Sequence, residues 1–369
     1  MQKYNPENER LKLKYFDYET EANGKSPKTI ESIRKAMIRY EEFTSYQSFK
    51  TFSHKQAMEF KAHLLKTKNR HGESLSLSTI AHTLAPMKEF LKWLAMQPNY
   101  KSSIRFSDIE YLNLTEKDKR GLQPNTLKQY PSAEQIRKAM GTFSGKSELD
   151  RRNQALMALV FATGIRDGAL IGLKLKHVNV AKKYVVQDPK EVATKFGKRI
   201  HSKFYPVGED IHQIVMEWVR YLREEKLFAD NDPLFPKEIL THDAEMTFRG
   251  GNLSREHWQG AVAVRGIFKQ AFERAGLPYF SPHRFRDTLS ALGRELCCNT
   301  EEQMAWAKNM GHESPATTFL VYGGFSPEQQ FEVIERLGRK TDAIPQNQDE
   351  IARALQILSK AVNSHALEI

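Results

Sequence analysis

The chain has 369 residues, of which 40% are hydrophobic, so it is long enough for two ordinary domains whose cores need neither disulfides nor a structural metal. No run approaches the ~20 apolar residues of a transmembrane helix, and the polar segment 1–10 predicts no secretory signal. The formal net charge of +11 favours a polyanionic partner, nucleic acid first, although a basic protein without such a partner would have the same composition.

The two cysteines, Cys297 and Cys298, are adjacent. Neighbouring cysteines rarely satisfy disulfide geometry. We therefore expect packed thiols in a reducing compartment, and neither a disulfide nor a metal-binding set.

Residues 1–100 have helical periodicity almost throughout, and residues 1–130 hold 23 basic residues against 15 acidic ones. Ser26 and Pro27 predict a helix start. The inward positions of three successive helices should be Ile30, Ile33, Met37, Tyr40 and Phe43; Met58, Leu64 and Leu65; and Ile80, Leu84, Met87, Leu91 and Leu94. Pro86 should kink the third helix or mark its true start. The expected first domain, 1–100, is a helical bundle with a basic loop at 66–72 that faces either solvent or phosphate.

Residues 101–131 predict a linker, because they combine prolines and the charged stretch 116–120 without a sustained period. The second domain is expected over 132–340 and should open with a capping box of Ser132 and Gln135.

The first half of this domain mixes helices and strands. Residues 153–173 predict a helix, a turn around Gly164 and another short helix. Strands are predicted at 184–186 and 204–207, with a hairpin turn at 195–199 between them. The expected fold class is therefore mainly α with a small β-sheet or hairpin in the second domain, an α+β protein.

The second half predicts helices alone. A long helix within 253–276 should stop at Gly276, and Pro282 should open a helix over 283–296. A further helix is expected over 326–338. The tail, 341–369, predicts a short amphipathic helix whose apolar face holds Ile351, Leu355, Leu358 and Val362.

Several nucleotide and metal motifs are missing from the sequence. It has no Walker phosphate loop, no dinucleotide fingerprint, no Cys/His cluster with zinc spacing and no evident acidic metal cluster. A DNA enzyme of this composition would draw its phosphate chemistry from cations and a protein nucleophile.

Four residues suit such chemistry. Arg166 precedes a short helix and could share a bound phosphate with the helix start, or it could be an exposed arginine of a first turn. His283 and Arg286 are three residues apart, so one helical face could hold a phosphate and move a proton, although such pairs also occur by chance. Tyr322 could be a nucleophile if nearby arginines lower a phenol pKa of ~10, or it could be a packing tyrosine.

In order and spacing, these residues resemble the tyrosine site-specific recombinases, also called phage-type integrases. The motifs lie within 131–340 and are Thr163-Gly164-Ile165-Arg166 with Leu170-Ile171-Gly172-Leu173, then Thr194-Lys195-Phe196-Gly197, then His283-Arg284-Phe285-Arg286, then Gly311-His312 leading to Thr317, Thr318 and Tyr322. The helical, basic first domain is similar to the core-binding domain of that family, which clamps duplex DNA between two domains.

The resemblance implies that Tyr322 attacks a DNA phosphodiester, forms a 3′-phosphotyrosyl link and releases a 5′-hydroxyl. Lys195 would protonate the leaving 5′-oxygen. Because transesterification keeps the bond energy in the phosphotyrosine, the resemblance implies no cofactor, no metal and no ATP.

The other implied catalytic residues surround the phosphate. Arg166 and Arg286 would hold its non-bridging oxygens, and arginine keeps its charge because it cannot lose its proton in a protein. His283 and His312 would hydrogen-bond the phosphate and assist proton transfer.

The chain departs from the family pattern at four places, one of which is the interval from His312 to Tyr322, one residue longer than in many members. An acidic residue usually stands three positions after the first arginine, where this chain has Ala169, while Asp167 follows that arginine directly. A histidine often follows the second arginine, where this chain has Asp287. Lys198 competes with Lys195 for the position of the catalytic lysine.

The implied partner is double-stranded DNA at specific recombination sites. The residues that we expect to contact it, beyond the catalytic set, are Lys66, Lys68, Arg70, Lys198 and Arg199. The resemblance also implies a homotetramer on paired sites, a monomer or weak oligomer otherwise, accessory DNA-bending proteins as a further option, no membrane, and a location in the cytoplasm on DNA. The tail could be exchanged between protomers or could pack on its own domain.

Two other functions fit the same residues. A type IB topoisomerase-like nicking-closing enzyme would share the nucleophile and differ in that strands are not exchanged between duplexes. A non-catalytic DNA-binding protein could keep the fold, and the departures near Arg166 would be its sign.

Overall fold

The computed structural model describes residues 4–69, 72–116, 118, 129–194, 197–242, 248–321, 331–332 and 334–335. The chain divides into two compact units, Met1–Thr126 and Leu127–Ile369. Within the described ranges, no helix combines the length and the hydropathy that a membrane span requires.

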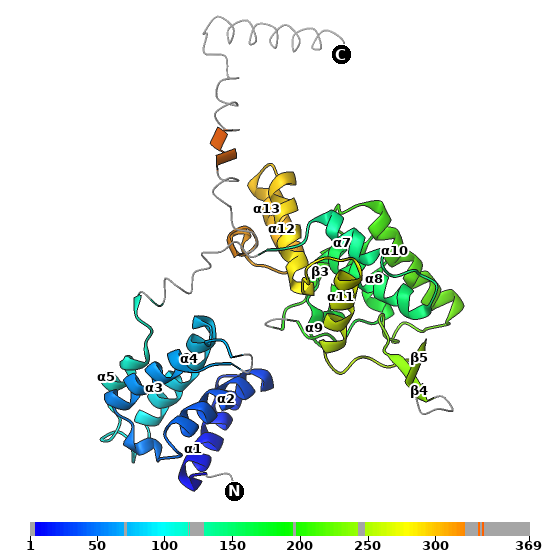
Figure 1. Ribbon diagram of the computed structural model, residues 1–369. Coiled ribbons are helices and arrows are strands. Elements are labelled where there is room, and N and C mark those ends of the chain that lie inside the picture. The colour runs from blue at the N-terminus through cyan, green and yellow to red at the C-terminus, as the bar shows by residue number, and fades with distance from the viewer. Residues whose placement is uncertain are drawn as a thin grey trace, which may run out of the picture. The chain divides into compact units, whose positions relative to one another are not determined.

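The described part of the first unit is a bundle of helices, coloured blue to cyan in Figure 1. Its α-helices are α1 Pro6–Asp17, α2 Pro27–Phe43, α3 His54–Lys66, α4 Leu77–Ala95 and α5 Phe106–Ile109. A π-helical turn η1 Tyr18–Ala22 and the 3-10 turns η2 Phe49–Thr51 and η3 Glu110–Leu112 lie between or after them.

Most of the predicted bundle is confirmed. Ser26 caps α2 by accepting a hydrogen bond from the main-chain N–H of Thr29, and the five predicted inward positions of α4 are all buried. The prediction for α3 was wrong in two positions, because Met58 and Leu65 are exposed. Pro86 lies inside α4, which begins nine residues earlier, so this proline does not mark the helix start.

The expected linker at 101–131 differs from the structure in its first part. Residues 106–112 form α5 and η3, and Ile104, Ile109 and Leu112 are buried in the core of the first unit. The Lys61 ammonium of α3 donates to the main-chain oxygens of Tyr111 (3.0 Å) and residue 113 (2.8 Å). The segment is too short for its apolar residues to show a helical period. In the structure, these apolar residues complete the core of the bundle.

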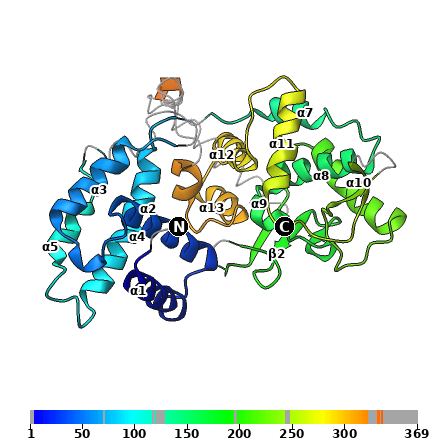
Figure 2. The same cartoon turned by 60° about the horizontal axis from the view of Figure 1, so that its bottom comes forward.

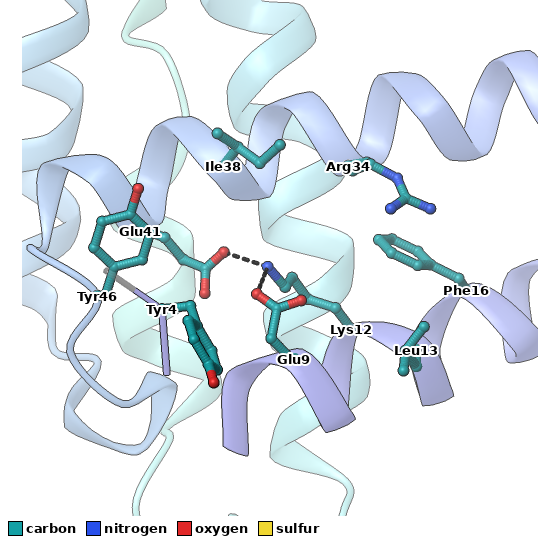
Figure 3. Close-up of a pocket in the computed structure, with 9 residues that line it drawn as sticks. All are labelled: Tyr4, Glu9, Lys12, Leu13, Phe16, Arg34, Ile38, Glu41 and Tyr46. Carbon is teal, nitrogen blue, oxygen red and sulfur yellow. Dashed lines mark hydrogen bonds and ion pairs between the residues drawn. The ribbon is translucent and has the colours of Figure 1, made fainter. Parts of the chain in front are cut away.

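A hollow of about 260 Å³ between α1 and α2 contains a buried ion-pair network (Figure 3). The Lys12 ammonium lies 2.6 Å from a carboxylate oxygen of Glu41 and 2.6 Å from one of Glu9. Asn8 also donates to Glu41 (3.1 Å). Burial alone would lower the pKa of Lys12, but the hydrogen bonds that its ammonium donates to Glu41 and Glu9 raise the pKa above its ordinary value. Lys12 is therefore charged at neutral pH and balances the buried Glu41.

We predict that Lys12→Met destabilises the first unit by about 3–5 kcal/mol, because it leaves the Glu41 carboxylate buried without its cation. Urea unfolding of the full chain, followed by circular dichroism, measures the change. Lys14→Met is the matched control, since Lys14 lies on α1 but is exposed, and it should change stability by less than about 0.5 kcal/mol. Equal effects of the two variants would show that the network contributes nothing.

The described part of the second unit is also mainly helical, with two small antiparallel sheets. Its α-helices are α7 Ala133–Met140, α8 Glu148–Thr163, α9 Asp167–Leu170, α10 Glu209–Arg220, α11 Val262–Arg274, α12 Phe285–Leu296 and α13 Thr300–Asn309. Its strands are β1 Val178–Asn179, β2 Tyr184–Gln187, β3 Ile200–Lys203, β4 Glu238–His242 and β5 Phe248–Leu253. Shorter turns are η4 Leu175–His177, η6 Tyr221–Glu225, η7 Pro282–Arg284 and η8 Thr317–Val321.

Helix α8 forms the centre of the second unit, and α7, α10 and α12 pack against it (Figure 1). Almost every residue from Ala155 to Thr163 is buried, as its continuous apolar run requires. Helices α12 and α13 lie next to each other, as Figure 2 shows from another side. The core therefore fixes both the end of α8 and the start of α12.

The predicted capping box is confirmed, since Ser132 and Gln135 cap α7 reciprocally. The predicted strand at 184–186 is confirmed as β2, but the strand expected at 204–207 was wrong: β3 covers Ile200–Lys203. The register pairs Val185 with Ser202, and Phe204 and Tyr205 follow the strand and enter the core. Because Phe204 and Tyr205 are buried aromatic residues, they continue the apolar sequence pattern of a strand although β3 has already ended.

Two further differences concern the helix over 283–296 and the cysteines. His283 lies in the 3-10 turn η7, and the α-helix begins only at Phe285. Cys297 and Cys298 are both thiols, as predicted, but the expectation that both are packed was wrong for Cys298, which is exposed. The expected helices at 326–338 and in the tail lie mostly or wholly outside the described residues.

Candidate active site

The guanidinium of Arg286 is the centre of the candidate site. Arg286 lies in the first turn of α12 and is almost completely buried. It donates to the main-chain oxygen of Gly164, to that of Met310 (3.0 Å) and to Nε2 of His312 (2.6 Å). A buried charge requires such hydrogen bonds, so the arginine holds together two loops that are far apart in the sequence.

Both loops turn at a glycine in the left-handed region. Gly164 ends α8 with a φ of 64°, and Gly311 precedes His312 with a φ of 75°. A Cβ atom on Gly311 would lie 2.6 Å from Cδ1 of Ile200 in β3. Only glycine fits both the backbone angle and this close approach, which places His312 against Arg286.

We predict that Gly311→Ala lowers stability by about 1–3 kcal/mol, through backbone strain and overlap with Ile200. Gly276→Ala is the control, because Gly276 has a φ of 68° but open space around its Cβ position, so it shows the strain alone. Thermal unfolding compares the two. A melting temperature of Gly311→Ala at or above that of Gly276→Ala would contradict the close packing of this loop.

The imidazole of His312 is buried between two partners. Arg286 contacts Nε2, and Oγ1 of the buried Thr318 lies 2.8 Å from Nδ1. Thr318 belongs to η8, a π-helical turn that packs against α12 and ends one residue before Tyr322. The sequence does not predict this contact, because a spacing of six residues corresponds to neither a helical nor a strand contact.

His283 lies within the field of the same cations. Protein atoms around its ring, and then the positive charges of Arg286, Arg166 and Arg284, lower the pKa of His283 to about 4. The ring is therefore neutral at pH 7 and can accept a proton. The charges of Arg166 and Arg286 both act on this histidine, and Arg286 contacts His312, so the four predicted catalytic residues within the described ranges lie in one region of the second unit.

Arg166 differs from Arg286 in its surroundings. It is partly exposed at the start of α9, and its guanidinium has no hydrogen bond or ion pair with any residue that the structure describes. Helix α9 has only four residues, so the helix dipole that we expected to assist Arg166 is short. The side chain is available to an anion.

Two acidic residues at positions where the chain departs from the family pattern, Asp167 and Asp287, each pair with an arginine. Asp167 accepts from Nε of Arg265 (2.8 Å) and also acts on the charge state of His283. Asp287 is buried and accepts from Arg284 (3.2 Å). Both carboxylates thus neutralise arginines next to the site.

The β2–β3 loop and the strand β3 that follows it both contact the segment around His312. Lys198 forms an ion pair with Glu313, the neighbour of His312. At the far end of β3, away from the loop, Asn309 accepts from the main-chain N–H of Lys203 (2.6 Å) and donates to its oxygen (2.8 Å). The loop in which the catalytic lysine was expected is therefore joined to the segment that carries His312.

Several predicted residues are not placed at this site by the structure. Tyr322, Lys195 and Arg70 lie outside the described residues. Arg199 is exposed and pairs with Asp188 (3.0 Å). In the first unit, Lys66 and Lys68 are exposed at a short turn between α3 and α4, in which Lys68 and Ser74 form a β-bridge.

The described geometry suits an anionic centre of tetrahedral shape. It combines two guanidinium groups, one neutral histidine near them and one histidine in direct contact with the buried arginine. Guanidinium groups hydrogen-bond phosphate oxygens and keep their charge, and imidazoles can hydrogen-bond and move protons. Such a set can bind a phosphodiester and stabilise additional negative charge on it.

Comparison with known sequences points in the same direction. The model of the phage integrase family matches residues 130–325. The tyrosine recombinase XerC of Halalkalibacterium halodurans is 23% identical over 303 residues, which cover 79% of this chain and 86% of that protein. The XerC of Actinobacillus succinogenes is 22% identical over 307 residues, which cover 83% and 89%.

Comparison with solved structures shows a shared fold. An integrase of the transposon Tn1549, in complex with transposon right end DNA, has a TM-score of 0.58 at 15% identity, and 89% of this chain and 98% of that chain are covered. A lambda integrase dimer bound to a core site has a TM-score of 0.56 at 11% identity, with 84% and 94% covered.

Proposed function

This chain belongs to the phage integrase family of tyrosine recombinases, which carry out site-specific DNA recombination, and we propose that its own reaction runs through a 3′-phosphotyrosyl link to Tyr322. The observation that carries the proposal is the convergence of Arg166, His283, Arg286 and His312, from three separate segments of the second unit. These are the residue types that bind and activate a phosphodiester.

The proposed reaction begins when a scissile phosphate binds to the two guanidinium groups. Arg166 needs no rearrangement to contact a non-bridging oxygen, whereas Arg286 exchanges one of its present contacts for the phosphate. The phenol oxygen of Tyr322 then attacks phosphorus, and its proton passes to a histidine. His283 is suited to this step because its lowered pKa leaves it neutral.

The bond between phosphorus and the 5′-oxygen breaks in the same step, and the leaving oxygen takes a proton. We assign this proton to Lys195, with Lys198 as the alternative. The ion pair of Lys198 with Glu313 supports the assignment to Lys195, because it occupies Lys198 with a carboxylate. Attack by a 5′-hydroxyl of another strand reverses the chemistry and releases Tyr322.

DNA binding should depend mainly on phosphate contacts. The first unit carries most of the excess positive charge of the chain, and Lys66 and Lys68 are exposed at one turn. The Tn1549 integrase and the XerH recombinase were solved in complexes with DNA, the latter with its difH substrate. We propose that Lys66, Lys68, Arg70, Lys198 and Arg199 contact the DNA backbone and that affinity falls with salt.

The test is to trap and map the DNA to which the protein becomes covalently linked. Nicked suicide fragments, drawn from a library of the source genome, let the leaving strand diffuse away and preserve the adduct. We expect a 3′-phosphotyrosyl link at recurring sequences, with a 5′-hydroxyl on the other side. An adduct of 5′ polarity, or no adduct across the library, would reject the proposal.

Recombination also requires assembly, and we propose a homotetramer on paired sites that exchanges its tail segments. An apolar hollow of about 400 Å³ at the end of β3, lined by Phe204, Tyr205, Leu296 and Trp306 among others, could accept an apolar helix face. The predicted tail face of Leu355 and Leu358 fits this character.

We predict that truncation before Pro345 weakens cooperative assembly on paired sites and leaves binding of one site nearly unchanged. Gel-shift titration on DNA with one and with two sites measures both. A matched control is the full chain with its tail intact and Lys360→Ala, which changes the polar side of the predicted tail helix. Assembly of the truncated protein with unchanged cooperativity would show that the tail packs on its own domain or has no role.

A further inference from the structure

The hydroxyl of Thr318 gives His312 a second buried partner that the proposed reaction does not yet use. Thr318 is fully buried, and its Oγ1 lies 2.8 Å from Nδ1 of His312. On the opposite side of the ring, Nη2 of Arg286 lies 2.6 Å from Nε2. The imidazole is therefore held between a group that only donates and a group that can donate or accept.

The partners determine the tautomer of neutral His312. A guanidinium offers no lone pair, so Nε2 must be the acceptor in its contact with Arg286. The ring proton then belongs to Nδ1, which donates it to Oγ1 of Thr318. In the protein without DNA, Nε2 of His312 thus carries no proton and accepts the hydrogen bond from Arg286.

A bound phosphate would require Nε2 to be a donor instead of an acceptor. Phosphate oxygens accept hydrogen bonds, so His312 can contact one through Nε2 only if that nitrogen carries a proton. If the ring stays neutral, Nδ1 becomes the acceptor and needs a donor, which the threonine hydroxyl becomes by rotation. If the ring is charged, Nδ1 still donates to the same hydroxyl. One hydroxyl therefore serves every state of the ring, as no aliphatic group of the same shape can.

We propose that Thr318 is a positioning residue whose hydroxyl lets His312 change from its contact with Arg286 to a hydrogen bond with the scissile phosphate. The role rests on the proposed function of the site. Because η8 ends one residue before Tyr322, the same bond ties the histidine to the segment that carries the proposed nucleophile. His312 then keeps its orientation only while the segment that contains Thr318 is packed against it.

The first test compares three variants in single-turnover cleavage of a nicked substrate. Thr318→Val keeps the shape and removes the hydroxyl, and we expect its cleavage rate to fall about tenfold or more, with DNA affinity within about twofold of the wild type. Thr318→Ser keeps the hydroxyl and should stay within about threefold. Thr317→Val is the matched control, since Thr317 is the exposed neighbour on the same turn, and it should behave as wild type.

The second test reads the tautomer directly in the full chain without DNA. Nitrogen-15 correlation spectra distinguish a protonated Nδ1 from a protonated Nε2, and the signal missing in His312→Gln identifies this ring. We expect a protonated Nδ1 and an unprotonated Nε2 in the wild type, and a loss of this preference for one tautomer in Thr318→Val. Circular dichroism melting confirms that the variants are folded.

The outcomes separate the inference from the function on which it rests. A wild type that forms no adduct would reject the proposed function, while the spectra would still decide the tautomer. A wild type that cleaves, with Thr318→Val at the same rate or Thr318→Ser as slow as Thr318→Val, would overturn the role of the hydroxyl alone. A wild-type ring with its proton on Nε2 would overturn it as well.

Discussion

Replacement of Tyr322 with phenylalanine is expected to abolish the covalent protein–DNA adduct, with a loss of at least about 10³-fold in cleavage rate. The variant lacks the oxygen that bonds phosphorus, and no other part of the proposed reaction replaces it. DNA affinity should remain close to that of the wild type, because in the proposed reaction Arg166 and Arg286 bind the phosphate. A nicked suicide substrate, resolved on denaturing gels, measures the adduct.

Tyr279→Phe provides the matched control for this experiment. Tyr279 is an exposed tyrosine close to Asp167 and Arg265, and therefore near the same site. The partial burial of the phenol, and then the carboxylate of Asp167, raise the pKa of Tyr279, although the charge of Arg265 acts to lower it. The raised pKa makes Tyr279 a poor nucleophile. We expect adduct formation to persist in Tyr279→Phe. Persistence in Tyr322→Phe together with loss in Tyr279→Phe would exchange the roles of the two tyrosines.

The two arginines should give different results when each is replaced by alanine. Both variants should lose about 10²–10³-fold in cleavage rate, because each removes a donor to the charged phosphate. Arg166→Ala should leave stability within about 0.5 kcal/mol of the wild type, since the described residues offer its guanidinium no partner. Arg286→Ala should lose about 2–4 kcal/mol, because the main-chain oxygens of Gly164 and Met310 lose their donor.

Urea unfolding and adduct formation, measured on the same preparations, check this contrast. Arg265→Ala is the control, because it removes a nearby guanidinium whose charge Asp167 already balances. A large loss of stability in Arg166→Ala would mean that this side chain has a structural partner beyond the described residues. Full stability in Arg286→Ala would mean that the two loops hold together without it.

The sequence predicts the helical elements well where local signals are strong. The caps at Ser26 and at Ser132 with Gln135 are side-chain to main-chain contacts within four residues, and spacing alone reveals them. The position of β3 could not be obtained in this way, because Phe204 and Tyr205 are buried by tertiary packing after the strand has ended. The helical turns over 106–112 could not be predicted either, because elements of three and four residues are too short to show a period.

The candidate site was predictable as a set of residues but not as a geometry. The resemblance to a family selected Arg166, His283, Arg286 and His312, and the structure brings these four together. Nothing in the sequence indicated that Arg286 would be buried and bonded to two main-chain oxygens while Arg166 would remain accessible. Thr318 belongs to the last of the family motifs, but its contact with His312 depends on a π-helical turn that no periodicity predicts.

The side chain of Asn309 has a consequence for solubility. Strand β3 is an outer strand of its sheet, and an outer strand with open main-chain groups is a template on which a second chain can add and start aggregation. The Asn309 amide satisfies both the N–H and the oxygen of Lys203, as a neighbouring strand would. One amide at the end of α13 thus closes this edge to pairing with another molecule at the last residue of β3, at the end of the strand opposite to the β2–β3 loop.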